Sequence, residues 1–307
     1  MPKDLVTLAD WPADELWSIA DRAATLRVLH REGNRPRTLE GRTLAMYFEK
    51  PSLRTHVTFE AGIAQLGGHA ILLKPEQIGI GTRESPADVA RVLSRWVDCL
   101  IARTFSHELV EQLARHATIP VVNGLTDLVH PCQAMADLVT IAGVMEPTEA
   151  TIAYVGDGNN VANSLILLAA VLGLRLHLAT PASHRPASRV MRSARALAEK
   201  SGAEIVLTED PIEAVKAVDF VYTDTWTSMG QEQEAAQRRE IFRDYQVNSD
   251  LMAHTAGAHV LHCLPAHRGE EVTAEVLDGP QSLILEQAEN RLHAQNAILE
   301  HLLGVGV

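Results

Sequence analysis

The sequence predicts an α/β protein built from two doubly wound domains with mainly parallel sheets. Short apolar runs alternate with amphipathic stretches along the chain, at the spacing of βα units. The alternation is interrupted between Gly143 and Ala150, where Met145-Glu-Pro-Thr148 breaks a helical pattern. Two consecutive βα series indicate two sheets, each covered by helices.

The first series supplies an N-terminal domain. It begins with a strand predicted at Thr43–Phe48 and a helix over residues 54–66, which Gly67-Gly68 ends. Further strands are expected at residues 69–74, 99–102 and 121–123, and further helices near 86–96, 107–117 and 131–143.

The second series supplies a C-terminal domain. Its strands are predicted at Thr151–Val155, Arg175–Ala179, and residues 204–207, 220–222 and 259–261. Helices are expected in most of the gaps, and residues 291–303 are predicted to form a closing helix.

The composition restricts the class of protein. A chain of 307 residues suits two domains of ordinary size, and 46% hydrophobic with 21% charged residues is typical of soluble globular proteins. No apolar run approaches the roughly 20 residues that span a bilayer. Met1-Pro2-Lys3-Asp4 lacks the layout of a signal peptide. Three cysteines without paired spacing favour reduced thiols, so we expect a cytoplasmic protein.

The net charge of −12 argues against nucleic acid and anionic membranes as partners, because both select basic surfaces. A phosphate-bearing ligand would therefore require positive charge to be concentrated locally. For this reason the arginines near the polar motifs matter more than the total charge.

Polar motifs follow the predicted strands, at the edge where parallel sheets bind ligands. The first, Pro51-Ser-Leu-Arg-Thr55, lies where a strand gives way to a helix. A helix start offers backbone N–H groups, while Ser52 and Thr55 add hydroxyls and Arg54 adds a planar fork, all suited to phosphate. The simpler alternative is that Ser52 only caps the helix and Arg54 is solvated.

Arg103 closes the strand at 99–102, and His130 and Gln133 lie on either side of the start of a predicted helix. His130 and Gln133 are three residues apart and share a helix face. An imidazole can donate to a carbonyl oxygen that becomes an oxyanion. An amide oxygen can accept from an NH₂ group. The alternatives are a surface arginine and a capping or core histidine.

Gly156-Asp-Gly-Asn-Asn-Val161 follows a strand in the manner of a dinucleotide-binding turn. Val161 stands where the third glycine is required, and the next strand ends Leu178-Ala-Thr-Pro181 without a carboxylate for a ribose. A nicotinamide-dependent oxidoreductase is therefore disfavoured.

Four motifs in this order resemble those of the aspartate/ornithine carbamoyltransferases, and the last two resemble the ornithine branch. They are Ser52-Leu-Arg-Thr55, His130-Pro-Cys-Gln133, Asp224-Thr-Trp-Thr-Ser-Met-Gly230 and His262-Cys-Leu-Pro265. The resemblance implies carbamoyl transfer from carbamoyl phosphate to the δ-amine of L-ornithine, which gives citrulline and phosphate in arginine metabolism. It implies no cofactor. No metal is expected either, because no His, Cys or carboxylate cluster has ligand spacing in the sequence.

The resemblance also assigns residues. Arg103, His130, Asp224 and Cys263 are implied to be catalytic. Carbamoyl phosphate is implied to bind Ser52, Leu53, Arg54, Thr55, Gln77, Arg103, His130, Gln133, Cys263, Leu264 and Arg291. Two positions depart from the family pattern. Leu53 replaces a threonine and loses its hydroxyl, and His56 replaces an arginine.

For the amino acid, the resemblance implies that Asn160, Asp224, Ser228 and Met229 bind ornithine. An Asp224 carboxylate suits a free α-ammonium group, which argues against an acylated ornithine; putrescine is a further alternative. Aspartate-type relatives need extra cationic groups, which are missing here. A non-catalytic module that keeps the fold is disfavoured by the intact Arg54, His130 and Cys263.

The resemblance further implies a homotrimer or a multiple of trimers. The glycine-bearing segment 77–85 shows no obvious apolar face and is implied to reach a neighbouring subunit, with Gln77 and Arg83 as phosphate contacts. The closing helix is implied to pack on the first domain. We therefore expect a carbamoyl phosphate domain of residues 1–143 with 291–307, and an ornithine domain of residues 144–290.

Overall fold

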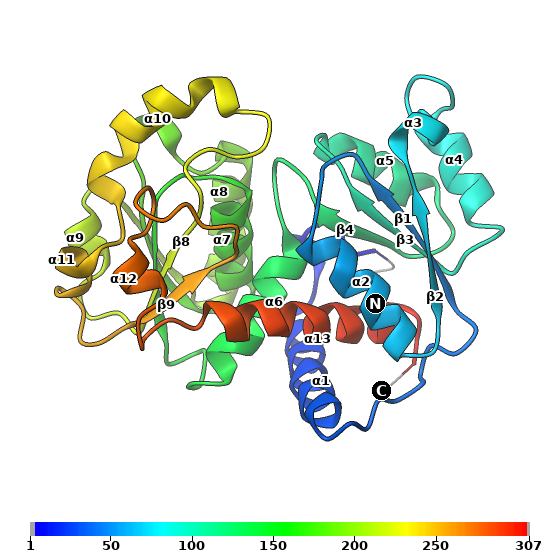
Figure 1. The fold of residues 1–307 in the computed structure, drawn as a ribbon, viewed down its shortest axis with the longest axis horizontal. Coiled ribbons are helices and arrows are strands. Elements are labelled where there is room, and N and C mark those ends of the chain that lie inside the picture. Colours follow the sequence, from blue (N-terminus) through cyan, green and yellow to red (C-terminus); the bar gives the residue numbers. More distant parts are fainter. Residues whose placement is uncertain (1–3, 306–307) are drawn as a thin grey trace. The chain divides into compact units, whose positions relative to one another are not determined.

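The computed structural model describes residues 4–305, which form two compact units. Unit 1 contains the chain up to Val139 together with the chain from Glu289 onwards, and unit 2 contains Thr140–Ala288. Each unit has one parallel sheet, with four strands in unit 1 and five in unit 2 (Figure 1). The prediction of two α/β units with parallel sheets is confirmed.

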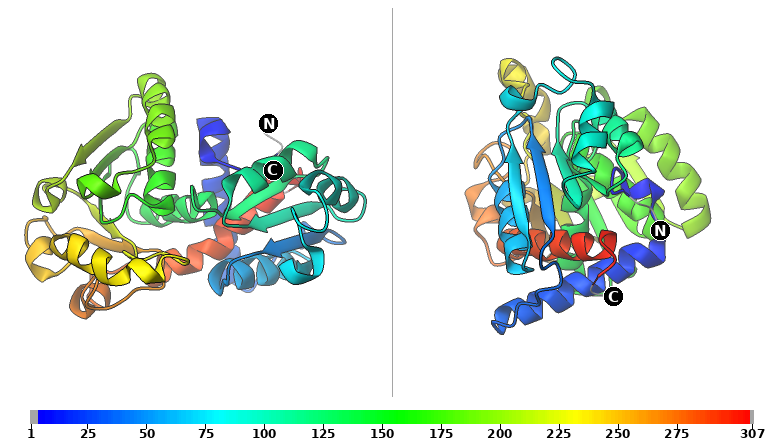
Figure 2. Two further views of the ribbon diagram at one scale, coloured as in Figure 1. Left: turned by 90° about the horizontal axis from the view of Figure 1, so that it is seen from above. Right: turned by 90° about the vertical axis from the view of Figure 1, so that its right-hand side faces the viewer.

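The sheet of unit 1 has the strand order β2-β1-β3-β4. Its strands are β1 (Thr43–Phe48), β2 (His69–Leu73), β3 (Cys99–Arg103) and β4 (Val121–Leu125). β1 lies between β2 and β3, and its last residue, Phe48, is paired with Arg103. The adjacent course of β1 and β2 can be followed in Figure 2. The register brings the polar segment after β1 to the same sheet edge as Arg103.

Two helices of unit 1 start at side-chain caps. Ser85 accepts a hydrogen bond from the Asp88 amide, and Ser106 accepts one from the Leu109 amide, so each side chain satisfies a free N–H group. The helices of unit 1 are α1 (Ala13–Arg31), α2 (Arg54–Gln65), α3 (Pro75–Ile78), α4 (Pro86–Leu93), α5 (His107–His116) and α6 (Pro131–Ala142). The short 3-10 helix η1 (Leu8–Asp10) precedes them.

The last helix, α13 (Ile284–Leu302), begins seven residues before the predicted start and packs on α1 and α6. Arg22 of α1 makes two hydrogen bonds to the Glu300 carboxylate, at 2.6 and 3.0 Å. Arg31 pairs with Glu289 at 2.7 Å. The expectation that the closing helix returns to the first unit is confirmed.

Residues 75–85 correct one expectation. Part of this segment is helical, and Ile78 and Ile80 pack against the unit 1 core cluster that includes Val110 and Leu113. The segment therefore does bury an apolar face. Its sequence hid this, because the two isoleucines are separated by Gly79, which takes a left-handed φ of 64°.

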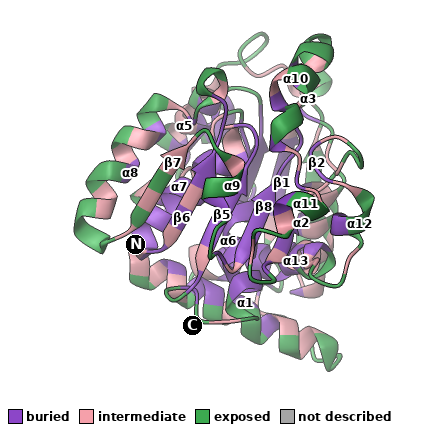
Figure 3. Ribbon diagram, turned by 90° about the vertical axis from the view of Figure 1, so that its left-hand side faces the viewer, coloured by how far each residue is buried: buried purple, intermediate pink, exposed green. Residues whose placement is uncertain are grey.

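The sheet of unit 2 has the strand order β7-β6-β5-β8-β9. Its strands are β5 (Thr151–Val155), β6 (Arg175–Ala179), β7 (Glu204–Thr208), β8 (Phe220–Thr223) and β9 (His259–His262). The central strands β5 and β8 are buried almost throughout (Figure 3). Such central strands carry continuous apolar runs because both faces are covered.

The helices of unit 2 are α7 (Asn160–Leu172), α8 (Ser188–Ser201), α9 (Pro211–Ala214), α10 (Ala235–Phe242), α11 (Ser249–Met252) and α12 (Ala274–Leu277). Short 3-10 helices are η2 (Ala182–His184), η3 (Glu232–Glu234) and η4 (Arg243–Tyr245). The side chains of α7 are buried from Val161 to Leu172, so this mostly apolar helix is covered on all sides. Within residues 4–305, the helices lack the combination of length and apolarity needed to cross a membrane.

Candidate active site

The start of α2 has the features of an anion site. Leu53 precedes α2 as its N-cap and makes no side-chain cap hydrogen bond. The structure therefore does not support the alternative in which Ser52 only caps this helix. Leu53 is 73% exposed, while Arg54 is half-buried and Thr55 is buried. His56 turns to Glu60, at 3.1 Å, one helical turn further on.

Two arginines from distant elements meet at Thr55. Arg291 of α13 donates to the Thr55 hydroxyl at 2.9 Å, and Arg103 of β3 donates to it at 3.3 Å. Arg103 also donates to the Pro51 carbonyl at 3.5 Å. Both arginines are buried, with 2% and 6% of their surface exposed. Unit 1 therefore concentrates positive charge at the start of α2, although the protein as a whole is acidic.

Gln133 lies beside this cluster in α6. Its amide oxygen accepts a hydrogen bond from Arg291 at 2.7 Å, and its amide nitrogen donates to Asp137 at 2.8 Å. Both Gln133 and Asp137 are buried. The predicted acceptor for a substrate NH₂ group is thus oriented by Arg291 from one side and by Asp137 from the other.

His130 lies beside the cationic cluster that Arg54, Arg103 and Arg291 form in unit 1. Burial lowers the pKa of His130 well below its usual range, and the charges of Arg291, Arg103 and Arg54 lower it further. The imidazole is therefore neutral at pH 7. A neutral ring adds no charge to the cluster and still provides one N–H donor.

Gln77 and Arg83 lie in the segment around α3, where Arg83 donates to the Gln77 carbonyl at 3.1 Å. Among residues 4–305, the hydrogen bonds and ion pairs of these two residues do not reach the cationic cluster.

In unit 2, Asp224 follows β8 and is buried. Its two carboxylate oxygens have different partners. Cys263 donates to one oxygen, with the sulfur at 3.0 Å, and the Asn159 amide donates to the other at 2.7 Å. Asn160, the predicted carboxylate ligand, is the next residue and begins α7.

Asn159 is a site residue that the sequence analysis missed. Its side-chain oxygen caps α7 by accepting from the amides of Val161 and Ala162, while its nitrogen holds Asp224. An asparagine directly before an apolar helical run is a recognisable N-cap signal. The contact with Asp224 lies outside what such a pattern can predict, because 65 residues separate the pair.

Arg238 of α10 was also missed. It is buried and donates to the Asp157 carboxylate and to the Trp226 carbonyl. Burial raises the pKa of Asp157 to about 7, although Arg238 opposes this shift. Arg238 thereby fixes the loop that leads from Asp224 to Ser228 and Met229. In this loop the Ser228 amide donates to Gln231 at 3.1 Å, and Met229 is 42% exposed.

The fold brings together a group that the sequence had separated. Ligand atoms of Asp224, His262 and Cys263 lie within 4.8 Å of one another, a grouping that their spacing in the sequence does not reveal. The His262 ring is nevertheless engaged elsewhere: Nδ1 accepts from the Leu264 amide at 2.8 Å, and Nε2 lies 3.1 Å from Glu271. With neither ring nitrogen available, these three residues do not make a metal-binding set.

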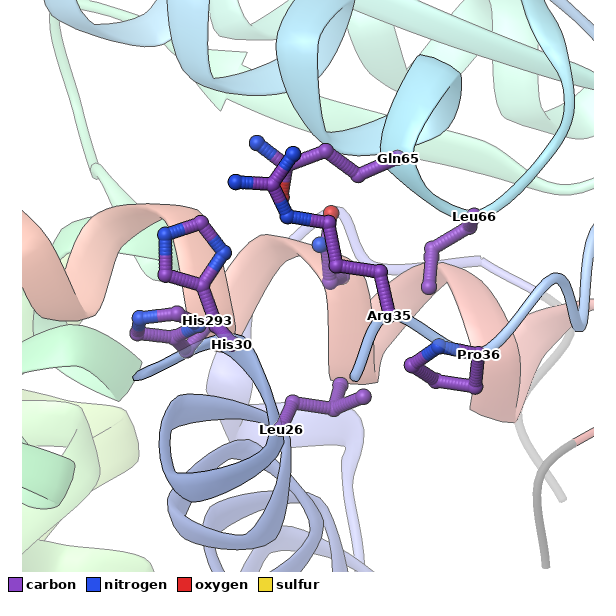
Figure 4. A pocket seen from close by; sticks show the side chains of 8 residues that line it. Leu26, His30, Arg35, Pro36, Gln65, Leu66 and His293 are labelled. Carbon is purple, nitrogen blue, oxygen red and sulfur yellow. The ribbon is translucent and has the colours of Figure 1, made fainter. Parts of the chain in front are cut away.

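A small cavity in unit 1 lies apart from these motifs (Figure 4). The rings of His30 and His293 meet there with centroids 5.3 Å apart. Burial, together with the neighbouring His30, lowers the pKa of His293 to about 4. The cavity's lining contains none of the predicted site residues. It comprises Leu26, His30, Arg35, Pro36, Gln65, Leu66, His293 and Asn296.

Both units match known domain families. Residues 3–143 match the carbamoyl-P binding domain of aspartate/ornithine carbamoyltransferase, and residues 148–302 match its Asp/Orn binding domain. The chain belongs to the aspartate/ornithine carbamoyltransferase family.

Particular relatives fall within the ornithine branch. The chain is 49% identical over 306 residues to the anabolic ornithine carbamoyltransferase of Pyrococcus furiosus, covering 98% of this chain and 96% of the relative. It is 51% identical over 303 residues to the ornithine carbamoyltransferase of Anoxybacillus flavithermus, with the same coverage.

Solved structures agree with these matches. The ornithine carbamoyltransferase from Pyrococcus furiosus aligns with a TM-score of 0.94 at 48% identity, covering 99% of this chain and 97% of that chain. The enzyme from Thermus thermophilus aligns with a TM-score of 0.87 at 43% identity, covering 99% of each chain.

Proposed function

We propose that the protein transfers the carbamoyl group of carbamoyl phosphate to the δ-amine of L-ornithine and releases L-citrulline and phosphate. The observation that carries this proposal is the pairing of Asp224 with Cys263 in unit 2. Unit 1 of the same protein gathers three arginines around Thr55. The high identity to ornithine carbamoyltransferases over nearly the whole chain supports the same acceptor.

Carbamoyl phosphate binds at the start of α2. Its phosphate accepts from the Ser52 hydroxyl, from the backbone N–H groups at the start of the helix and from the Arg54 fork. Arg103 and Arg291 add charge from the buried side. These contacts favour phosphate as a leaving group because they neutralise the charge that it gains when the C–O bond breaks.

The carbonyl oxygen gains negative charge when the amine attacks. Arg103, Thr55 and the neutral His130 ring donate to this oxygen, and Gln133 and the Leu264 carbonyl accept from the carbamoyl NH₂. The amine nitrogen forms the new C–N bond, the C–O bond to phosphate breaks with its electron pair, and the proton that the amine releases is taken up by the leaving phosphate. Catalysis thus depends on positioning and preorganised charge.

Ornithine binds in unit 2. Asp224 pairs with the α-ammonium group, Asn160 binds the α-carboxylate, and Ser228 and Met229 line the site. Cys263 lies next to the attacking δ-amine. A free α-ammonium group is the natural partner for the buried Asp224 carboxylate, which favours L-ornithine over putrescine and over acylated ornithine.

A colorimetric citrulline assay with carbamoyl phosphate and a panel of amines tests the proposal. L-Ornithine should be the preferred acceptor. If putrescine or N-acetylornithine is preferred, the proposed acceptor is wrong although the protein is a carbamoyltransferase. If the protein turns over a nicotinamide cofactor, or transfers no carbamoyl group to any amine, the proposed reaction is wrong.

We further propose a homotrimer, or a multiple of trimers, in which Gln77 and Arg83 serve the phosphate site of a neighbouring subunit. The exposed position of both residues, apart from the cationic cluster of their own unit, supports this assignment. We also propose a cytoplasmic role in arginine metabolism, in keeping with Cys99, Cys132 and Cys263, which are not joined in disulfides.

A further inference from the structure

The loop after β9 has an unusual backbone that needs support. Leu264 has a φ of 58°, in the left-handed region, and the Leu264–Pro265 peptide is cis. An L-leucine rarely adopts this φ and keeps it only where the surrounding contacts hold it in place. Contacts in the surrounding loop must therefore hold the backbone of Leu264 in this conformation.

Hydrogen bonds of unit 2 lead from this loop to a single carboxylate. The Leu264 amide donates to His262 Nδ1 at 2.8 Å, and His262 Nε2 lies 3.1 Å from Glu271 Oε1. The His267 amide donates to the same Glu271 oxygen at 2.6 Å. Glu271 therefore holds both ends of the segment that contains Leu264, one end through the His262 ring and the other through backbone.

These contacts define the protonation of His262. A backbone N–H group is a donor only, so Nδ1 must present a lone pair to Leu264 and Nε2 must carry the proton. Nε2 then donates to Glu271. Both side chains are fully buried, which excludes water as a substitute partner for either ring nitrogen.

We propose that Glu271 is a positioning residue that acts through His262 to hold Leu264 in the conformation required for carbamoyl transfer. The inference rests on the proposed function, in which the Leu264 carbonyl accepts from the carbamoyl NH₂ group. Neither Glu271 nor His262 contacts a reactant in this scheme. They fix the tautomer and the backbone, as a carboxylate partner does for a histidine in many catalytic sites.

The surroundings of Glu271 suggest how to separate its charge from its geometry. Its contacts to the loop backbone and to His262 both use Oε1, whereas Oε2 has no hydrogen-bond partner and lies 3.9 Å from the His267 ring. A glutamine can keep the single acceptor oxygen, and a leucine cannot. Glu270, the next residue, is more exposed and pairs with Arg239 at 3.0 Å, so Glu270→Gln is a matched control.

The kinetic test compares these variants in the full-length protein. Glu271→Leu should lower kcat roughly 10- to 100-fold with little change in KM for carbamoyl phosphate, because an interaction used in the transition state is lost. Glu271→Gln should recover most of the activity, and Glu270→Gln should behave as wild type. Wild-type kcat in a folded Glu271→Leu protein, or equal losses in Glu271→Leu and Glu270→Gln, would overturn the proposal.

A second arm tests the path through His262. Asparagine can place an acceptor near the Nδ1 position but cannot reach Glu271. If Glu271 acts through His262, then Glu271→Leu should lower kcat much less in the His262→Asn protein than in the wild type, and the loss that remains measures the contact of Glu271 with the His267 amide. Independent, multiplying losses would reject the relay.

The third arm needs no substrate. In ¹⁵N spectra of the wild-type protein at pH 7.5, His262 should have an unprotonated Nδ1 and a protonated Nε2, and Glu271→Gln should preserve this tautomer. A protonated Nδ1 would overturn the relay even in an active enzyme. Conversely, a wild-type protein with the expected tautomer but no citrulline formation would reject the proposed function alone. If Glu271→Leu does not fold, the Glu271→Gln spectrum and the His262→Asn kinetics still decide.

Discussion

The guanidinium of Arg291 lies 2.9 Å from the hydroxyl of Thr55, a residue 236 positions earlier in the chain. The same guanidinium donates to Gln133 and to Gln295, at 2.7 and 3.0 Å. One buried side chain thus connects the start of α2, α6 and α13, so the packing of unit 1 and the proposed phosphate site share a residue.

Replacing Arg291 by alanine should therefore reduce both the stability of unit 1 and its affinity for carbamoyl phosphate. The Gln133 amide oxygen loses its donor, while Thr55 and Gln295 each keep a second one. Leaving a buried acceptor unsatisfied costs about 1–3 kcal/mol of unfolding free energy. Urea unfolding measures the stability, and KM for carbamoyl phosphate should rise in the protein that remains folded. Arg31→Ala, which removes a more exposed pair with Glu289, serves as the control. Unchanged stability in Arg291→Ala would show that the contacts to Thr55 and Gln133 carry little energy.

Arg54 should affect binding with little effect on folding, because it is half-buried at the start of α2. Arg54→Ala should lose about 2–4 kcal/mol of transition-state stabilisation, and Arg54→Lys should lose the bidentate geometry while keeping the charge. Steady-state kinetics with varied carbamoyl phosphate give both values. Wild-type kinetics in Arg54→Ala would remove this residue from the phosphate site.

The rate at low ornithine should rise with pH. The δ-amine titrates near the lysine value of about 10.4, so the neutral nucleophile costs about 4–5 kcal/mol at pH 7. His130 should add no titration step in the neutral range, since burial and the nearby arginines hold its pKa well below 6.5. A rate that stays flat between pH 6 and 9 would contradict attack by a neutral amine.

Cys263→Ala should impair ornithine use far more than carbamoyl phosphate binding.

Acid should destabilise the fold through buried histidines. The pKa of His293 is lowered to about 4, whereas an unfolded histidine titrates near 6.5. Between these values the unfolded chain binds more protons, so the stability that the neutral ring contributes is present above pH 6.5 and lost as pH falls to about 4.

Urea unfolding of wild type and His293→Asn from pH 4.5 to 8 measures this contribution. The variant should show the shallower decline. Asp157, whose pKa is raised to about 7, stabilises the native state as the pH falls and so opposes the effect of His293. Because Asp157 is present in both proteins, the difference between their curves isolates His293. Parallel curves for the two proteins would remove His293 from the pH dependence.

Subunit mixing tests the proposed trimer. Arg54→Ala and the double variant Gln77→Ala/Arg83→Ala should each be nearly inactive. In a mixed closed ring with head-to-tail interfaces, one interface joins an intact phosphate site to an intact 77–85 segment, so about a third of wild-type activity per mixed trimer should return. Confirmed subunit exchange without recovered activity would reject a shared site.

The sequence predicted the elements whose signal is local. The strands β1, β5 and β6 were predicted with the bounds that the structure has, because each is a short apolar run between turn residues. Helix α1 was not predicted, and the start of α13 was placed seven residues late. Both helices carry many polar residues, and the pairs that hold them, such as Arg22 with Glu300, join opposite ends of the chain.

The same distinction applies to the candidate site. Single motifs named the residues at the strand ends, yet the contacts among them depend on the fold. Arg238 shows this most clearly: an arginine within the charged sequence of α10 looks like a surface residue, but it is buried against Asp157 and Trp226. Periodicity carries no signal for such a contact.

The return of α13 to unit 1 also has a consequence for synthesis on the ribosome. The chain leaves unit 1 after Val139 and rejoins it at Glu289, so all of unit 2 is translated in between. At 5–20 residues per second, this interval lasts on the order of 7–30 s. During that time Arg22 of α1 has no Glu300 to pair with, and Thr55 has no Arg291. The nascent chain can therefore complete the arginine cluster around Thr55, the proposed phosphate site, only after helix α13 has emerged.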